Sequence, residues 1–121
     1  MMILVVDDSK VMRKLVIRTI RQAGFEEAEV LEAEDGGEAL GIARTSDLDV
    51  VLTDWNMPNM TGIELLNALR AEGNMVKVGF VTSESSGSIR QQADAAGASF
   101  LLSKPIDADQ LADALNAGSR A

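Results

Sequence analysis

Short apolar segments alternate along the chain with longer segments in which apolar positions recur at helical spacing. The apolar segments are rich in β-branched residues, and residues 3–6 and 50–52 are apolar at every position. Such segments are typical of parallel strands that are covered on both faces. The pattern predicts strands at residues 2–6, 28–34, 48–53, 76–82 and 99–103, and helices at residues 10–23, 36–44, 62–71, 88–96 and 107–117.

Residues at the predicted helix ends support these assignments. Asp35 precedes Glu38, and Thr61 precedes Glu64, at the three-residue spacing of a capping box. Gly24 is expected to end the first helix, since glycine adopts the left-handed conformation that commonly closes a helix.

Five strand–helix repeats predict an α/β fold. Right-handed crossovers place the helices on both faces of an open sheet, and five strands are too few for a closed eightfold barrel. We therefore expect a doubly wound (βα)5 parallel sheet. Ligands of such sheets bind beyond the carboxyl ends of the strands.

Composition narrows the chemistry that the chain can perform. Its 121 residues suit one domain, and the absence of cysteine and histidine excludes thiol nucleophiles, Cys/His zinc sites and Ser-His-Asp triads. Any metal must be held by oxygen, which favours Mg²⁺, Mn²⁺ or Ca²⁺.

The charge of the chain argues against several classes of partner. A formal net charge of −8 makes the chain a poor default binder of nucleic acid or of anionic membranes. No apolar run approaches the length of a membrane span, and the apolar start ends at Asp7 without the basic residues of a signal peptide. We expect a cytoplasmic protein with no membrane insertion.

Polar residues with complementary chemistry follow four of the five predicted strands. If all strands are parallel, these residues meet at one edge of the sheet. Three carboxylates this close repel one another, so a divalent cation or proton uptake must relieve them. A carboxylate nucleophile flanked by a metal, a lysine and a hydroxyl describes a site for a transferred phosphoryl group. The four groups are Asp7-Asp8-Ser9, Asp54-Trp55-Asn56, Thr82-Ser83-Glu84 and Lys104-Pro105.

Each group taken alone also has an ordinary structural interpretation. Asp7-Asp8-Ser9 before a helix can serve as a cap, and the segment 54–58 can form a turn, since Asn and Pro are turn formers. Thr82 can be a plain strand end, and Lys104 a solvated lysine. Complementary chemistry at four separate strand ends is hard to obtain by accident, and this conjunction favours a functional site.

The sequence resembles the response-regulator receiver domains, and among them the single-domain chemotaxis regulators of the CheY type. The resemblance extends from about residue 2 to residue 117, and the stretch 54–60 is closest to the chemotaxis type. It is carried by Val6-Asp7-Asp8-Ser9 with Met12-Arg13, Asp35-Gly36 with Glu38-Ala39-Leu40, Asp54-Trp55-Asn56-Met57-Pro58-Asn59-Met60 with Gly62, Thr82 with Glu84, and Lys104-Pro105.

The resemblance implies a flavodoxin-like sheet with strand order 2-1-3-4-5. It also implies a role for each residue of the site. Asp54 would accept a phosphoryl group from a phosphohistidine on a sensor histidine kinase, and Lys104 would pair with the phosphoryl oxygens. Mg²⁺, or Mn²⁺ in its place, would be ligated by Asp8, Asp54 and the backbone carbonyl of Asn56, and by Asp7 through water. The Lys104–Pro105 bond would be cis.

The family's switch implies an output face. Thr82 would turn toward the phosphoryl group and couple it to a surface of the fourth helix, fifth strand and fifth helix, where a downstream protein binds. We expect the helix at 88–96 to be thinly anchored, because only Ile89, Ala93 and Ala96 are available for burial.

Two positions depart from the family pattern. Receivers usually carry Tyr or Phe three residues before the lysine, where this chain has Leu101. Phe100 is one residue earlier, and strand alternation should point it to the opposite face. The residue after the aspartate pair is Ser9, whereas chemotaxis regulators of this type carry an aromatic there.

Five of the eleven basic residues lie on the predicted first helix. They are either a solvated face or a docking surface for an acidic kinase or phosphotransfer domain. These residues are Lys10, Arg13, Lys14, Arg18 and Arg21.

Other functions compete with the receiver hypothesis. A phosphatase of the haloacid-dehalogenase type also uses Asp, Thr and Lys, but its nucleophile strand comes first and a second Asp takes the place of Asn56. A flavin carrier would need a phosphate loop after the first strand, where Asp7 and Asp8 would repel the phosphate. Within the receiver family, a phosphorelay intermediate or a phosphate sink stays open. We expect one receiver domain over residues 1–121 with no output domain, acting as a signalling protein that catalyses only its own phosphotransfer and dephosphorylation.

Overall fold

The computed structural model describes residues 1–83 and 86–117, in which strands and helices alternate. All ten predicted elements are present, with bounds that differ from the prediction by at most two residues. The strands are β1 (Met2–Val6), β2 (Glu29–Ala33), β3 (Val50–Asp54), β4 (Lys77–Thr82) and β5 (Phe100–Ser103), and the helices are α1 (Lys10–Gln22), α2 (Gly36–Thr45), α3 (Gly62–Ala71), α4 (Gly87–Ala96) and α5 (Ala108–Ala117).

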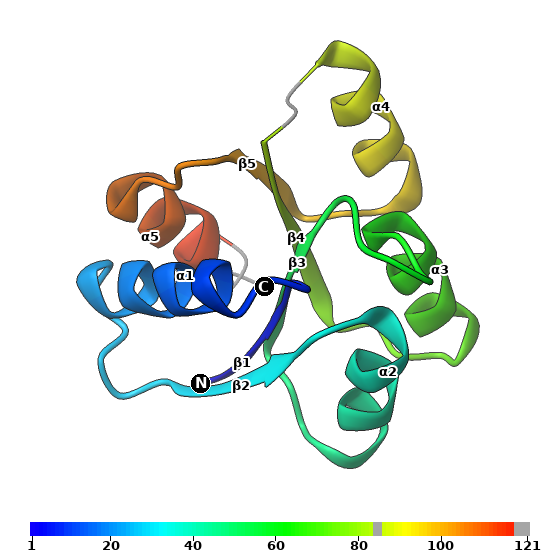
Figure 1. The fold of residues 1–121 in the computed structure, drawn as a ribbon, viewed down its shortest axis with the longest axis horizontal. Coiled ribbons are helices and arrows are strands. Elements are labelled where there is room, and N and C mark those ends of the chain that lie inside the picture. The colour runs from blue at the N-terminus through cyan, green and yellow to red at the C-terminus, as the bar shows by residue number, and fades with distance from the viewer. Residues whose placement is uncertain (84–85, 118–121) are drawn as a thin grey trace.

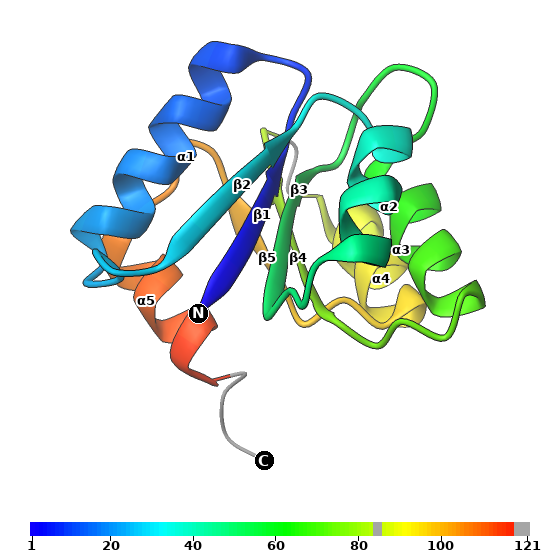
Figure 2. The same ribbon diagram turned by 90° about the horizontal axis from the view of Figure 1, so that it is seen from below.

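The five strands form one parallel sheet in the order β2-β1-β3-β4-β5. Helices α1 and α5 cover one face, and α2, α3 and α4 cover the other, so that the molecule has three layers (Figure 1). Figure 2, seen from below, shows the same separation of helices on the two sides of the twisted sheet. The predicted doubly wound fold and strand order are confirmed.

Two hydrophobic clusters flank the sheet, as expected for strands that are apolar at every position. Leu4 and Val6 pack toward α2, α3 and α4, whereas Ile3 and Val5 pack toward α1 and α5. In β5 the predicted separation is confirmed, because Leu101 belongs to the first cluster and its neighbour Phe100 packs against the second. Helix α4 is thinly anchored, because its buried residues are Ile89 and Ala93.

The helix ends follow the sequence signals. Thr61 and Glu64 form a full capping box, and the Asp35 side chain accepts a hydrogen bond from the Glu38 amide. Gly24 follows α1 with φ +102°, as predicted for a residue that closes a helix. The Lys104–Pro105 bond is cis, as the family resemblance implied.

Among the described residues, the structure has no helix that is both long enough and apolar enough to span a membrane.

Candidate functional site

The carboxyl ends of the strands bring the predicted site residues to one edge of the sheet. Asp7 and Asp8 directly follow β1, Asp54 is the last residue of β3, and Thr82 is the last residue of β4. Lys104 follows β5, and its backbone amide donates to the Thr82 carbonyl at 2.8 Å. Parallel pairing therefore joins residues that are nearly one hundred positions apart in sequence.

The three aspartates form a compact acidic cluster. A carboxylate oxygen from each of Asp7, Asp8 and Asp54 lies within 4.8 Å of one from each of the others. Asp7 is buried, Asp54 is half-buried and Asp8 is exposed, so that the cluster opens to solvent on the Asp8 side. An all-oxygen donor set with one open side fits a hard divalent cation that keeps some of its water.

Lys104 lies between two of these carboxylates. Its Nζ is 3.2 Å from Asp7 Oδ2 and 3.5 Å from Asp54 Oδ1, and its side chain is 16% exposed. One ammonium group cannot neutralise three carboxylates. A cation bound to the cluster would supply the charge that is still needed.

The pKa of Asp54 is raised above its ordinary value. Burial of the carboxyl group is the main cause, because it disfavours the charged form, and the neighbouring Asp7 adds repulsion. Lys104 and a hydrogen bond from the Trp55 amide, 2.8 Å from Asp54 Oδ1, act in the opposite direction without cancelling the shift. The ionised form of the side chain predicted as the nucleophile is therefore disfavoured by its surroundings.

The loop between β1 and α1 is held by polar contacts. The Ser9 amide donates to Asp7 Oδ1 at 2.9 Å, and Ser9 also caps α1. Arg13 reaches back from the first turns of α1, where its Nη1 donates to the Asp7 carbonyl at 2.7 Å and its Nε to Glu32 at 2.9 Å. Arg13 thus fixes the backbone that carries the aspartate pair.

The predicted basic face of α1 is corrected by these contacts. Arg13 is buried and belongs to the interior, because its guanidinium binds Asp7 and Glu32 instead of facing a partner. Arg21 donates to three backbone carbonyls of the loop after α1. The spacing of basic residues along a helix indicates its polar positions. It does not indicate which of these residues has a partner inside the protein.

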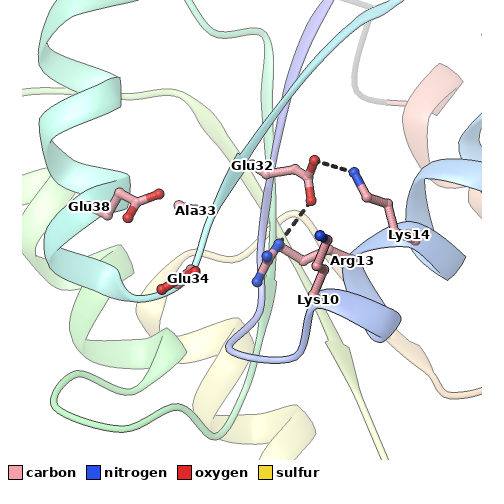
Figure 3. Close-up of a pocket in the computed structure, with 7 residues that line it drawn as sticks. All are labelled: Lys10, Arg13, Lys14, Glu32, Ala33, Glu34 and Glu38. Carbon is pink, nitrogen blue, oxygen red and sulfur yellow. Dashed lines mark hydrogen bonds and ion pairs between the residues drawn. The ribbon is translucent and has the colours of Figure 1, made fainter.

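A shallow pocket of about 170 Å³ lies between α1 and the start of α2 (Figure 3). Glu32 points from β2 toward α1 and joins two of its basic side chains, with Lys14 Nζ at 2.7 Å. Glu34 and Glu38 lie on the other side of the strand. Cationic side chains therefore line one side of this pocket and carboxylates the other.

Two basic residues stay available on the outer surface of α1. Lys10 and Arg18 are exposed and make no ion pair with a described residue. They flank Val11 and Leu15, whose side chains are exposed on the same stripe. Leu15 also lines a small apolar pocket beside Pro105, which leads toward Lys104.

The loop between β3 and α3 is held by close packing. The Gly62 amide donates to the Trp55 carbonyl at 2.9 Å, and the Trp55 ring meets Phe80 edge-on with centroids 4.9 Å apart. Met57 is buried, and Asn59 adopts φ +70°. The loop is thus a compact turn with an exposed Asn56 two positions after Asp54.

Gly62 is required by its surroundings. A methyl group at this position would collide with the backbone carbonyl of Asp54 and would come within 2.8 Å of the Phe80 ring. The sequence pattern gave no structural reason for this glycine, because the colliding atoms belong to β3 and β4.

Thr82 is buried at the end of β4, one residue beyond the position paired with Asp54. Glu84, which the sequence placed with Thr82, lies outside the described residues.

Comparison with known proteins identifies the family to which this arrangement belongs. The family model described as the response regulator receiver domain matches residues 3–116. The chain is 39% identical over 113 residues to the chemotaxis protein CheY of Pseudomonas aeruginosa, covering 92% of this chain and 90% of that protein. It superimposes on the chemotaxis protein CheY4 of Vibrio cholerae with TM-score 0.84 and 36% identity, over 96% of both chains.

The fold likeness extends to receivers from other regulators. The receiver domain of the Francisella response regulator 1452 gives TM-score 0.83 at 29% identity, covering 97% of this chain and 94% of that one. These matches confirm the resemblance that the strand-end residues indicated.

Proposed function

Because this chain belongs to the response regulator receiver domain family, we propose that it is a signalling domain that accepts a phosphoryl group on Asp54. The observation that carries this proposal is the position of Lys104, whose ammonium group lies between Asp7 and the raised-pKa carboxyl of Asp54. Phosphoryl transfer needs a nucleophile, a fixed cation beside it and room for a metal, and these groups converge here.

The acidic cluster is the proposed metal site. Asp8, Asp54 and the backbone carbonyl of Asn56 would hold Mg²⁺ or Mn²⁺ directly, and Asp7 would act through a water molecule. The close oxygens of the three aspartates support this assignment. When bound, the cation neutralises charge on the oxygens of the transferred group.

The transfer step follows from the groups present. One Asp54 oxygen attacks the phosphorus of a donor phosphohistidine and forms the P–O bond of an acyl phosphate while the P–N bond breaks. The electron pair of that bond returns to the donor imidazole, which leaves as the neutral ring after taking up a proton. Lys104 would pair with the phosphoryl oxygens during the transfer. The Asp7 carboxylate accepts a hydrogen bond from Lys104 and so positions its ammonium group beside Asp54.

The partners are proposed from surfaces beside the site. A sensor histidine kinase or phosphotransfer domain would dock near α1, where Val11 and Leu15 form an apolar stripe between Lys10 and Arg18. A downstream protein would bind the face of α4, β5 and α5, with Thr82 coupling that face to the phosphoryl group. The thin anchoring of α4 supports this, because a weakly held helix shifts easily between two arrangements.

The biological setting is proposed from the relatives. Chemotaxis proteins match the chain over most of their length. We propose signalling of the chemotaxis type, in which output follows from docking to a partner.

Mass spectrometry after incubation with acetyl phosphate tests the acceptor. The protein should gain one phosphoryl group only when Mg²⁺ is present, and Asp54→Asn should abolish the gain. Lys104→Met should bind Mg²⁺ but phosphorylate poorly. Phosphorylation that persists in Asp54→Asn would place the acceptor elsewhere.

Thr82 needs its own test. Amide exchange with and without beryllofluoride, a phosphoryl mimic, should show a change in protection across α4 that is lost in Thr82→Ala. A full change in that variant would show that Thr82 does not carry the signal.

A further inference from the structure

The Met60 side chain, from the loop between β3 and α3, packs against Gly36 at the start of α2. Gly36 is the first residue of α2 and is buried. A methyl group added there would lie 2.8 Å from Met60 Cγ and 2.9 Å from Met60 Cβ, and closer still to the Met60 sulfur. Met60 thus occupies the space that any larger residue at position 36 would need.

Rotation of the Met60 side chain does not remove this conflict. The sulfur and Cγ can move away by changing side-chain torsions, but Cβ is fixed to the backbone. A residue larger than glycine at position 36 therefore displaces either the start of α2 or the backbone at Met60. The start of α2 is held in turn by its Asp35 cap, which accepts the Glu38 amide at 2.8 Å.

The backbone at Met60 belongs to the same closed turn as Asn56. The Met60 amide donates to the Pro58 carbonyl at 2.8 Å, and the Gly62 amide closes the loop on Trp55 at 2.9 Å. A turn tied internally in this way moves as a unit. A push at Met60 is expected to reach the Asn56 carbonyl, four residues earlier.

We propose that Gly36 is a positioning residue for the metal site, although it lies on α2 and is not itself a proposed ligand. Because Gly36 has no side chain, Met60 can pack against the start of α2. This packing fixes the position of the β3–α3 loop, and with it the position of the Asn56 carbonyl beside the acidic cluster. The inference rests on the proposed function, because it assumes that Asn56 contributes a ligand. On this proposal, metal affinity also depends on the contact between α2 and the β3–α3 loop.

The test is Gly36→Ala, compared with two matched variants of the same helix. An added methyl at Gly37 meets only the Asp35 carboxylate at 3.5 Å, and one at Gly41 meets nothing within 4 Å. All three variants gain the same helix-favouring methyl. Only Gly36→Ala pushes on the loop, so the controls separate loop displacement from a general effect of alanine in α2.

Mg²⁺ affinity is measured by titrating Trp55 emission, since the chain has one tryptophan and it follows Asp54. Gly36→Ala should weaken Mg²⁺ binding about tenfold, as loss of support behind metal ligands commonly does. Gly37→Ala and Gly41→Ala should match the wild type. In the metal-free state, the Asn56 backbone amide should shift in the NMR spectrum of Gly36→Ala alone.

A second substitution distinguishes displacement from damage to the fold. Met60→Gly removes the sulfur, Cγ and Cβ, which are all three colliding atoms. In the Gly36→Ala background it should restore at least half of the lost affinity on a logarithmic scale, with Met60→Gly alone as the reference. Damage to α2 itself would not be rescued from the loop.

The outcomes separate the two proposals. A wild type that shows no Mg²⁺ response overturns the proposed metal site. A wild type that binds Mg²⁺ beside a folded Gly36→Ala that binds it equally well overturns the positioning role of Gly36 and leaves the metal site standing. Lost affinity in Gly36→Ala without rescue by Met60→Gly also overturns the positioning role.

Discussion

Two loops frame the acidic cluster, and they are fixed by different forces. The β1–α1 loop is held by hydrogen bonds and charges: Ser9 and Lys104 bind the Asp7 carboxylate, and Arg13 binds the Asp7 carbonyl. These contacts depend on ionised groups. The geometry of this loop is therefore sensitive to the loss of a single charge.

The β3–α3 loop is held by shape. Gly36 and Gly62 leave space that Met60, Phe80 and the Asp54 carbonyl fill. Such contacts are indifferent to pH and salt but intolerant of an added methyl group. The site therefore combines one loop held by charge with one loop held by shape, and each loop can be perturbed separately.

Gly62→Ala should produce the largest loss. Its methyl group would collide with the Asp54 carbonyl and the Phe80 ring, neither of which can turn away. We expect the free energy of unfolding in urea to fall by about 3 kcal/mol. Gly41→Ala, whose methyl meets open space, should change it by less than about 1 kcal/mol and in the stabilising direction. A Gly62→Ala variant as stable as Gly41→Ala would refute close packing as the force that holds this loop.

Arg13→Met should come next, with a loss of about 2 kcal/mol. The variant keeps most of the apolar contacts of the buried side chain but leaves the Asp7 carbonyl unpaired and Glu32 with Lys14 alone. Arg18→Met, at an exposed position of the same helix, should stay within about 0.5 kcal/mol of the wild type. Equal losses in both variants would show that the Asp7 contact contributes nothing.

The Arg13→Met loss should also depend on pH. Lys14 and then Arg13 lower the pKa of Glu32 below its ordinary value of 4.5. A carboxyl whose pKa is lower in the folded state stabilises the fold above its unfolded pKa, and this contribution disappears as pH falls through the folded pKa. The difference between wild type and Arg13→Met should therefore shrink in acid, whereas the Gly62→Ala difference should not.

Asp54→Asn should act in the opposite direction and stabilise the metal-free protein at pH 7. Burial, with repulsion from Asp7, raises the pKa of Asp54, so its ionised form costs folding energy at neutral pH. The neutral amide avoids that cost, and the gain should vanish in acid, where Asp54 is protonated. Thermal unfolding in a chelating buffer measures the effect, with the exposed Asp47→Asn as control. A destabilised Asp54→Asn would mean that the Lys104 pair outweighs burial.

Lys14→Gln should give the smallest change. Lys14 reaches the same carboxylate as Arg13, but its side chain is 57% exposed where that of Arg13 is 8% exposed. We expect a loss of about 0.5 kcal/mol that disappears in 0.5 M salt, because solvent ions screen exposed pairs. The Arg13→Met loss should largely survive the same salt. A Lys14→Gln loss that persists in salt would place this pair with the buried contacts.

The sequence alone predicted the fold and the polar residues that gather at one edge of the sheet. Apolar runs separated by helical periodicity sufficed for five parallel strands, because each local pattern agrees with the same βα repeat. Parallel pairing then required Asp7, Asp54, Thr82 and Lys104 to meet at one edge. Register alternation also placed Phe100 and Leu101 on opposite faces of β5, as the structure has them.

Only the tertiary structure decided how the site is supported. From the sequence, Arg13 is one of several basic residues on a polar helix face. Its partners, Glu32 and the Asp7 carbonyl, are known only from the structure, in which β2 and the end of β1 lie beside α1. From the sequence, Gly36 and Gly62 are glycines at the starts of helices. In the structure, atoms from other segments lie so close to each of them that a side chain would collide. Local patterns report which face of an element is buried, whereas a close approach between two elements depends on the packing of both, which no single segment encodes.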